Sequence, residues 1–295
     1  MSETPTFHIG ICMAGAVSAG AYTAGVIDFL LEALEDWEQR KLRGENVPRH
    51  NVVIDVVSGA SAGGMTSIIA ATAAQQEVVP VQRVKEHTLE SRPENVFYHS
   101  WVDLDEGDVL QHLLDPADLY ERGLVSALNS TFIKNIARRS LGNLAHLNRP
   151  KPYFSQDLRA FVTLSNLNGT SYAVKFIGES HQNYYVTNHH DYGCFRMVED
   201  ETEYKDDGWM PLNFRKNINT ALAEACAIAT GAFPIALEHQ KIQRDERYLQ
   251  DHPWFKNAVT FHTEPNSPEG IVVTSNVAVG DKADAFSIGP SAEIF

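Results

Sequence analysis

The distribution of hydrophobic residues predicts alternating buried strands and helices at the start of the chain. Two short apolar runs, residues 7–13 (FHIGICM) and 52–57 (VVIDVV), are typical of buried strands. Small residues follow each run, and a helical pattern follows the small residues. Strand, glycine-containing loop and helix, repeated in that order, are typical of an α/β fold with a parallel sheet, whose strands are buried on both faces.

The 3.6-residue period of apolar positions predicts three helices. The first covers about residues 21–42, the second 62–75 and the third 217–232, where the helix ends because Pro234 cannot continue it. One face of the first helix carries the regularly spaced apolar residues that we expect to be buried: Val26, Leu30, Ala33, Leu34 and Trp37.

The middle of the chain has a different texture. Residues 76–152 mix helical segments, loops and prolines, which predicts a largely helical insertion or lid. Residues 157–165 and 172–177 are predicted strands joined by a turn at 166–170 (NLNGT). The segment 180–208 is polar and is predicted to be rich in turns, whereas 271–279 is strand-like.

Composition narrows the functional classes. The chain has 295 residues, 43% of them hydrophobic, and its net charge of -14 argues against nucleic acid as a partner. Three dispersed cysteines (Cys12, Cys194 and Cys226) do not form a disulfide framework, so we expect a reducing, cytoplasmic setting. No run approaches the roughly 18 apolar residues of a spanning helix, so any contact with lipid is expected from the surface. The sequence predicts no oligomeric state.

The most informative motif is G-x-S-x-G at residues 59–63, directly after the second predicted strand. A serine at the tip of a tight strand-to-helix turn needs neighbours without bulk, and Gly59 and Gly63 provide that room. The helix that follows would direct its unpaired N–H groups and the positive end of its dipole toward Ser61. The alternative is an ordinary N-cap serine. No G-K-[ST] follows the motif, which argues against a P-loop.

Two further segments extend the motif into a resemblance. The loop 15–20 (GAVSAG) and the following residues 21–27 (AYTAGVI) stand before the serine motif, and residues 225–234 (ACAIATGAFP) stand far downstream. Together with G-x-S-x-G they resemble the patatin-like phospholipases. The resemblance implies a three-layer α/β sandwich with a mainly parallel sheet and a helical insertion, in one domain spanning 1–295. It also implies esters of lipids as substrates and no metal or organic cofactor. No H-E-x-x-H motif accompanies the twelve histidines.

The resemblance also assigns roles to residues of this chain. Ser61 matches the nucleophile, and Gly59 and Gly63 match the flanking glycines of the elbow. The backbone N–H groups of an oxyanion hole correspond to the following positions: Gly15, Ala16, Val17, Ser18 and Ala62. The second and third glycines of the family loop are Ala16 and Val17 here. Because the donors are backbone groups, this departure does not remove them.

The general base is the weakest part of the match. Patatin-like enzymes use a Ser-Asp dyad whose aspartate lies in a D-G-[GA] motif after the proline segment, and no such motif follows Pro234. Asp207-Gly208 precedes the third predicted helix, which is the wrong order. Asp281, beside Gly280 at the end of a strand-like run, stands closest to the expected place. We expect the chain to be an N-terminal portion of the family domain, truncated near this motif.

Three functions remain open from the sequence. The first is a serine acyl hydrolase acting on lipid esters, with peripheral contact to a membrane. The second is a non-catalytic patatin-like protein that binds lipid or another protein, which the missing D-G-[GA] favours. The third is an acyltransferase, in which an alcohol replaces water, and the sequence does not separate this from hydrolysis.

Overall fold

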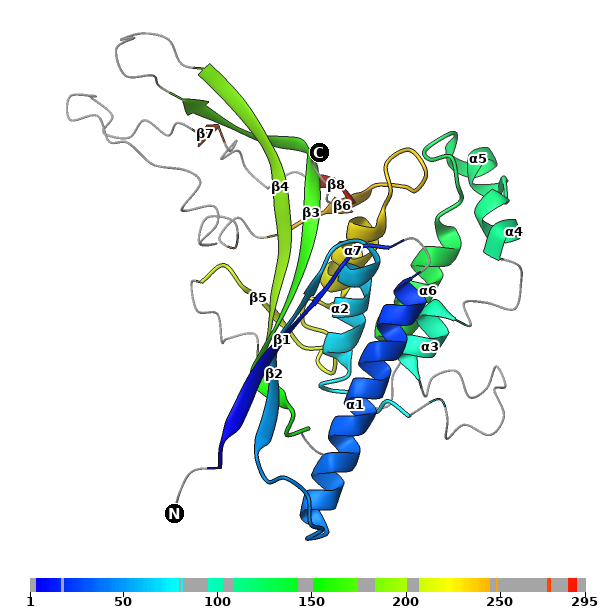
Figure 1. Ribbon diagram of the computed structural model, residues 1–295. Coiled ribbons are helices and arrows are strands. Elements are labelled where there is room, and N and C mark those ends of the chain that lie inside the picture. Colours follow the sequence, from blue (N-terminus) through cyan, green and yellow to red (C-terminus); the bar gives the residue numbers. More distant parts are fainter. Residues whose placement is uncertain are drawn as a thin grey trace, which may run out of the picture.

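The structure is a computed structural model that describes residues 4–16, 19–79, 81, 95–102, 109–142, 151–174, 184–200, 207–244, 248, 275–276 and 286–290. Its centre is a mixed sheet (Figure 1). The strands are β1 (Thr6–Met13), β2 (Asn51–Gly59), β3 (Phe154–Val174), β4 (Tyr184–Met197), β5 (Met210–Leu212), β6 (Gln240–Ile242), β7 (Ser275–Asn276) and β8 (Phe286–Pro290).

The first five strands lie side by side in sequence order, β1-β2-β3-β4-β5. The strands β1, β2 and β3 are parallel, β4 is antiparallel to β3, and β5 is parallel to β4. The strand β8 pairs antiparallel with the middle of β3 and β7 with its far end, and β6 pairs with β8. The carboxyl ends of β1 and β2 therefore meet at one edge of the sheet, which is where ligands bind in α/β proteins.

Helices cover the sheet. They are α1 (Gly20–Leu42), α2 (Ala62–Thr72), α3 (Val96–Trp101), α4 (Val109–Leu114), α5 (Ala117–Arg122), α6 (Thr131–Gly142) and α7 (Thr220–Gly231). Figure 1 shows α1, α2, α3, α6 and α7 packed on one face of the sheet, with α4 and α5 at the end of the molecule opposite the last turn of α1. The helices α3 to α6 fall within the segment 76–152. The predicted α/β class is confirmed.

The core lies between the sheet and these helices. The innermost sheet residues are Ile54, Leu158, Val162 and Phe195, all fully buried. The helix α2 is buried over nearly its whole surface, with only Met65 partly exposed. A helix that is apolar on every side and lies at the centre of the fold holds its first residue in a fixed place. That first residue, Ala62, directly follows the candidate nucleophile.

The predicted buried face of α1 is confirmed only in part, since Leu34 is buried and Leu30 and Trp37 are half-buried against the core. Val26 and Ala33 are exposed, and the buried stripe consists instead of Ala24, Ile27, Leu31 and Leu34. The helix is apolar around more than one face, since Tyr22 and Phe29 are also exposed on it. Because two overlapping apolar stripes both follow the 3.6-residue period, the pattern alone did not select between them.

Two predictions for the later strands are also wrong. The predicted turn at residues 166–170 is an irregularity within the single long strand β3, where the register with β4 shifts between Ser165 and Thr170. Asn166 stabilises it, because its side-chain oxygen accepts hydrogen bonds from the N–H groups of Asn168 and Gly169. The segment 180–208, predicted to be turn-rich, contains β4. The prediction took polar residues as a sign of exposed turns, but Asp191 and Arg196 of this strand are buried.

Candidate active site

Ser61 lies in the tight turn between β2 and α2, as the motif predicts. Its backbone has φ 52° and ψ -125°, a conformation that L-residues other than glycine rarely adopt. Such strain is found mostly at functional sites, where the surrounding structure enforces it. The Ser61 carbonyl accepts the Met65 N–H at 2.9 Å, so the serine begins α2 directly. The side chain of Ser61 is half-buried.

The two glycines of the motif are needed for steric reasons. A Cβ at Gly63 would lie 2.2 Å from the Met13 carbonyl oxygen, and one at Gly59 would lie 2.4 Å from the carbonyl carbon of Gly63. Both obstacles are backbone atoms, which cannot move aside without moving β1 or α2. The turn is also tied to β1, since the Ala60 N–H donates to the Met13 carbonyl at 3.2 Å. Close packing of three backbone segments thus forms the elbow.

The loop after β1 faces the side chain of Ser61. A Cβ at Gly15 would lie 3.2 Å from the Ser61 Cβ and 3.9 Å from its Oγ. The parallel pairing of β1 with β2, which matches Met13 with Gly59, brings the loop to this position. Gly15 is therefore next to the candidate nucleophile, and Ala16 follows it in the chain. Val17 and Ser18 lie outside the described residues.

The first turn of α2 supplies the other expected donor. Within the described part of the chain, the Ala62 N–H has no acceptor, as is normal for the first residue of a helix. No acidic residue lies in this first turn, so the positive end of the helix dipole is not offset there. An oxyanion formed beside Ser61 would meet this end of the helix.

The helix α3 packs against the end of the glycine loop, at the start of α1. Trp101, the last residue of α3, packs on Gly20, where a Cβ would lie 2.2 Å from the indole ring. Gly20 is the first residue of α1. Gly15 therefore lies beside the elbow, and Gly20 lies beside an aromatic ring of α3.

A residue with no role assigned by the sequence completes the elbow. The Ser61 N–H donates to Oγ1 of Thr230, near the end of α7, at 2.9 Å, and Thr230 is fully buried. Thr230 belongs to the segment 225–234, which contributed to the family resemblance without a function of its own. Nothing in the periodicity of α7 marks this threonine as different from its neighbours.

No acidic side chain of the described residues is hydrogen-bonded to Ser61. Among the described residues, no group accepts a hydrogen bond from the Ser61 hydroxyl. Asp281 lies outside the described residues. Asp207 directly precedes the segment leading to β5, which is three strands from β2, and three strand spacings amount to about 14 Å. This aspartate is therefore too far across the sheet to form a dyad with Ser61.

A buried ion pair lies on β4, on the far side of β3 from the elbow. Arg244 donates to the carboxylate of Asp191, and its second nitrogen donates to the Tyr192 carbonyl at 2.6 Å. Burial raises the pKa of the nearby Cys226 thiol to about 12 and also raises the pKa of Cys194. These thiols stay protonated at neutral pH, so they are structural rather than nucleophilic.

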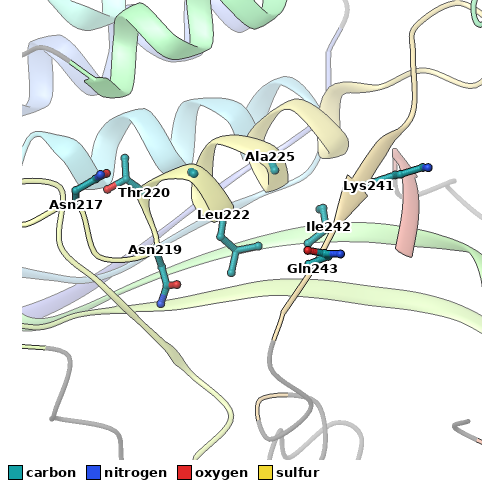
Figure 2. Close-up of a pocket in the computed structure, with 9 residues that line it drawn as sticks. Asn217, Asn219, Thr220, Leu222, Ala225, Lys241, Ile242 and Gln243 are labelled. Atoms are coloured by element: carbon teal, nitrogen blue, oxygen red, sulfur yellow. The ribbon is translucent and has the colours of Figure 1, made fainter. Parts of the chain in front are cut away.

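A separate pocket of about 380 Å³ lies at the other end of α7. Its lining comprises Asn217, Asn219, Thr220, Ala221, Leu222, Ala225, Lys241, Ile242 and Gln243. Figure 2 shows Leu222 of α7 on one side and Ile242 and Gln243 on the other, while Lys241 points away. Thr220 and Thr230 are at opposite ends of the helix, about 15 Å apart along its axis. The pocket is therefore distinct from the surroundings of Ser61.

Neither a metal site nor a membrane span is found in the part of the chain that the structure describes. No group of three or more His, Cys, Asp or Glu side chains there is placed to hold a metal ion. None of the helices described is long and apolar enough to cross a membrane.

Comparison with known proteins gives two matches. The chain is 38% identical over 188 residues to the uncharacterized protein y4iI of Sinorhizobium fredii (strain NBRC 101917 / NGR234), covering 59% of this chain and 26% of that protein. The chain thus spans about a quarter of the length of this relative. No solved structure matches the chain. The family model of patatin-like phospholipase matches residues 11–251, which include the glycine loop, the elbow and α7. The chain belongs to the patatin-like phospholipase family.

Proposed function

We propose that this chain is a serine acyl hydrolase that cleaves acyl esters of lipids through an acyl-enzyme on Ser61. One observation carries the proposal: the strained backbone of Ser61, at φ 52°, in a turn that faces the glycine loop after β1. A merely capping serine needs no such strain, because N-cap residues adopt ordinary extended conformations. Family membership supports lipid esters as the substrate class.

The proposed reaction has two steps. Ser61 Oγ attacks the ester carbonyl while its proton passes to a carboxylate base, and the N–H groups of Ala62 and of the loop 15–18 stabilise the resulting oxyanion. The tetrahedral intermediate then expels the alcohol, which takes the proton from the base. In the second step the same base deprotonates water, and the resulting hydroxide attacks the acyl-enzyme. The bond between the acyl carbon and Ser61 Oγ then breaks, the base returns the proton to Oγ, and the carboxylic acid leaves. The residues proposed for the oxyanion hole are Gly15, Ala16, Val17, Ser18 and Ala62.

We assign the role of base to Asp281, which follows a strand-like run as the family aspartate does. The nearby strand β8 supports this choice, because its Pro290 pairs with Leu164 of β3, two residues beyond the last pair between β3 and β2. The chain therefore returns after Asp281 to the strand end that carries Ser61. Asp281→Asn is expected to lower kcat about 10²- to 10⁴-fold, the usual contribution of a general base. Asp284→Asn is the matched control, and equal losses in both variants would refute the assignment.

Contact with a lipid surface is part of the same proposal. Three strongly exposed apolar side chains lie in or shortly after the helices α5 and α7: Tyr120 (86% exposed), Leu124 (82%) and Ile235 (87%). The segments carrying Leu124 and Ile235 are joined, since the Ala127 N–H donates to the Ile235 carbonyl at 2.8 Å. Ile235 follows Thr230, which contacts Ser61, by five positions, a chain length of at most about 18 Å. The acidic residues of α5 favour a zwitterionic over an anionic surface.

Vesicle flotation tests this contact. We expect the protein to float with phosphatidylcholine vesicles more than with phosphatidylglycerol vesicles, and the double variant Leu124→Ser/Ile235→Ser to float less. Leu42→Ser removes a similarly exposed leucine, the last residue of α1, and the last turn of α1 lies at the opposite end of the molecule from α5 (Figure 1); this variant is the control. Equal flotation of both variants and the wild type would contradict this surface assignment. The cysteine usage supports the further proposal of a cytoplasmic setting.

Hydrolysis of p-nitrophenyl esters tests the proposed activity. The wild type is expected to release p-nitrophenol from short and medium acyl chains, and Ser61→Ala to release it at the uncatalysed rate. The matched control is Ser67→Ala, which removes a buried hydroxyl of α2 that donates to the Gly63 carbonyl at 2.7 Å. Equal rates for the wild type and Ser61→Ala would rule out Ser61 as the nucleophile.

The second candidate is a lipid-binding protein of this family without catalytic activity. The lack of a D-G-[GA] motif after Pro234 favours it. This candidate predicts that the wild type floats with vesicles yet hydrolyses no ester, and that Asp281→Asn changes neither property. Hydrolysis that depends on Ser61 would exclude it.

A further inference from the structure

We propose that Thr230 is a positioning residue, which orients Ser61 for attack by accepting the hydrogen bond of its backbone N–H. This inference rests on the proposed function, in which Ser61 is the nucleophile. It concerns a side chain 169 positions further along the chain, on a different helix.

The backbone N–H of Ser61 has its hydrogen-bond acceptor on another helix. With φ at 52°, this N–H belongs to neither the ladder of β2 nor the hydrogen bonds within α2, and Thr230 Oγ1 accepts it at 2.9 Å. An unpaired N–H at such a position would carry the full cost of its lost hydration. Thr230 therefore stabilises the one conformation of Ser61 in which the turn is strained.

The helix α7 approaches the elbow closely at Thr230. A Cβ at Gly64 would lie 2.7 Å from Cγ2 and 2.9 Å from Oγ1 of Thr230. The glycine at position 64 thus leaves space for the threonine beside the turn. Both the methyl group and the hydroxyl of Thr230 are in contact with the first turn of α2, and the side chain is fully buried. Its hydroxyl oxygen is consequently held in one place.

The backbone N–H groups at the elbow differ in whether they already have an acceptor within the protein. The N–H of Ala60 donates to Met13 and the N–H of Ser61 donates to Thr230, whereas the N–H of Ala62 has no acceptor among the described residues. Thr230 thus fixes the peptide group between Ala60 and Ser61, and with it the direction of the Ser61 side chain. Small displacements of a nucleophile are costly, since 1 Å of misplacement lowers rates about 10²-fold. The downstream segment 225–234 gains a physical role in this way.

Three variants test the inference. Thr230→Val keeps the shape and removes the acceptor, Thr230→Ser keeps the acceptor, and Thr72→Val is the matched control. Thr72 is a fully buried threonine at the far end of α2, with its hydroxyl donating to the Ile69 carbonyl at 2.7 Å. We expect Thr230→Val to lower kcat about 10- to 100-fold with little change in KM. Thr230→Ser should retain most of the activity, and Thr72→Val should retain all of it.

Amide exchange provides a second readout that does not need hydrolysis. The Ser61 amide is expected to exchange slowly in the wild type and in Thr230→Ser, and at least tenfold faster in Thr230→Val. An active wild type with an equally active Thr230→Val would overturn the inference, as would equal exchange of the Ser61 amide in both proteins. A wild type without hydrolysis but with a protected Ser61 amide would instead refute the proposed function, and the catalytic part of this inference with it.

Discussion

The strain at Ser61 predicts an unusual effect of replacing the serine by glycine. Both Ser61→Gly and Ser61→Ala remove the hydroxyl that the proposed mechanism requires, so both variants should be inactive. They differ only in the Cβ atom and in backbone freedom. At φ 52° and ψ -125°, alanine retains the steric strain of serine, whereas glycine adopts this conformation without a steric penalty. Ser61→Gly should therefore be the more stable of the two inactive proteins.

The size of the difference follows from two opposing terms. A residue held in a sparsely populated backbone region costs about 1–3 kcal/mol, and glycine removes this cost. Glycine also gains freedom in the unfolded chain, which destabilises the fold by about 0.5–1 kcal/mol relative to alanine. Any hydrogen bond of the Ser61 hydroxyl is lost equally in both variants, so it does not enter the difference between them. With the middle of each range, the net gain for Ser61→Gly is about 1 kcal/mol.

Urea unfolding followed by circular dichroism measures this difference directly. The two variants should have the same dependence of unfolding free energy on urea and different midpoints, because only stability changes. In a thermal scan the expected gain corresponds to a rise in Tm of a few degrees for Ser61→Gly, at about 2–4 °C per kcal/mol. Gly25→Ala, an exposed helical position, calibrates the intrinsic effect of exchanging these two residue types. If Ser61→Gly were as stable as Ser61→Ala or less so, the backbone strain inferred at the elbow would be refuted.

Three further predictions concern other parts of the molecule. Gly63→Ala should unfold at markedly lower urea concentration than the wild type, because its Cβ would lie 2.2 Å from a backbone oxygen. In Gly25→Ala the Cβ meets nothing within 4 Å, so this variant should gain up to about 1 kcal/mol of unfolding free energy. Equal urea midpoints for the two variants would contradict the steric account. In the native protein at pH 8, a thiol reagent should label the exposed Cys12 and leave Cys226 unlabelled until urea unfolds the chain. The reason is that burial shields Cys226 and raises the pKa of its thiol to about 12. Rapid labelling of Cys226 in the native protein would show that α7 is not packed as described. Burial raises the pKa of Asp28, so the folded state binds the proton of this carboxyl more tightly than the unfolded state does. The wild type should therefore lose stability relative to Asp28→Asn as the pH rises from about 4 through the raised pKa. A stability difference between the two proteins that does not depend on pH would refute this prediction.

The part of the fold that carries the site was predictable from the sequence. The strands β1 and β2 read as short apolar runs, and the turn at Ser61 follows from glycines that only a close backbone approach requires. The prediction that the first strand is buried is wrong, because β1 lies at the end of the strand order and Met13 is its one buried residue. Local spacing was sufficient here because the elbow is built from residues adjacent in the chain. The α/β class follows from the same alternation.

Other features depend on contacts between distant segments and were not predictable. The strand β4 places Asp191 and Arg196 in the interior, where pairing with Arg244 and Asp157 replaces water, and a reading of polarity takes such a strand for a loop. The short strands β5 and β6 have too few residues to show a period. The contact of Thr230 with Ser61 joins two helices far apart in the sequence, so no local pattern reveals it.

The most direct test of the central claim is the mass of the protein after reaction with a slowly hydrolysed acyl ester or a fluorophosphonate. The account predicts one covalent adduct per chain, located by peptide mapping on Ser61, and no adduct on Ser61→Ala of the same fold. An adduct on another residue would contradict the account. So would ester hydrolysis by Ser61→Ala at the rate of the wild type.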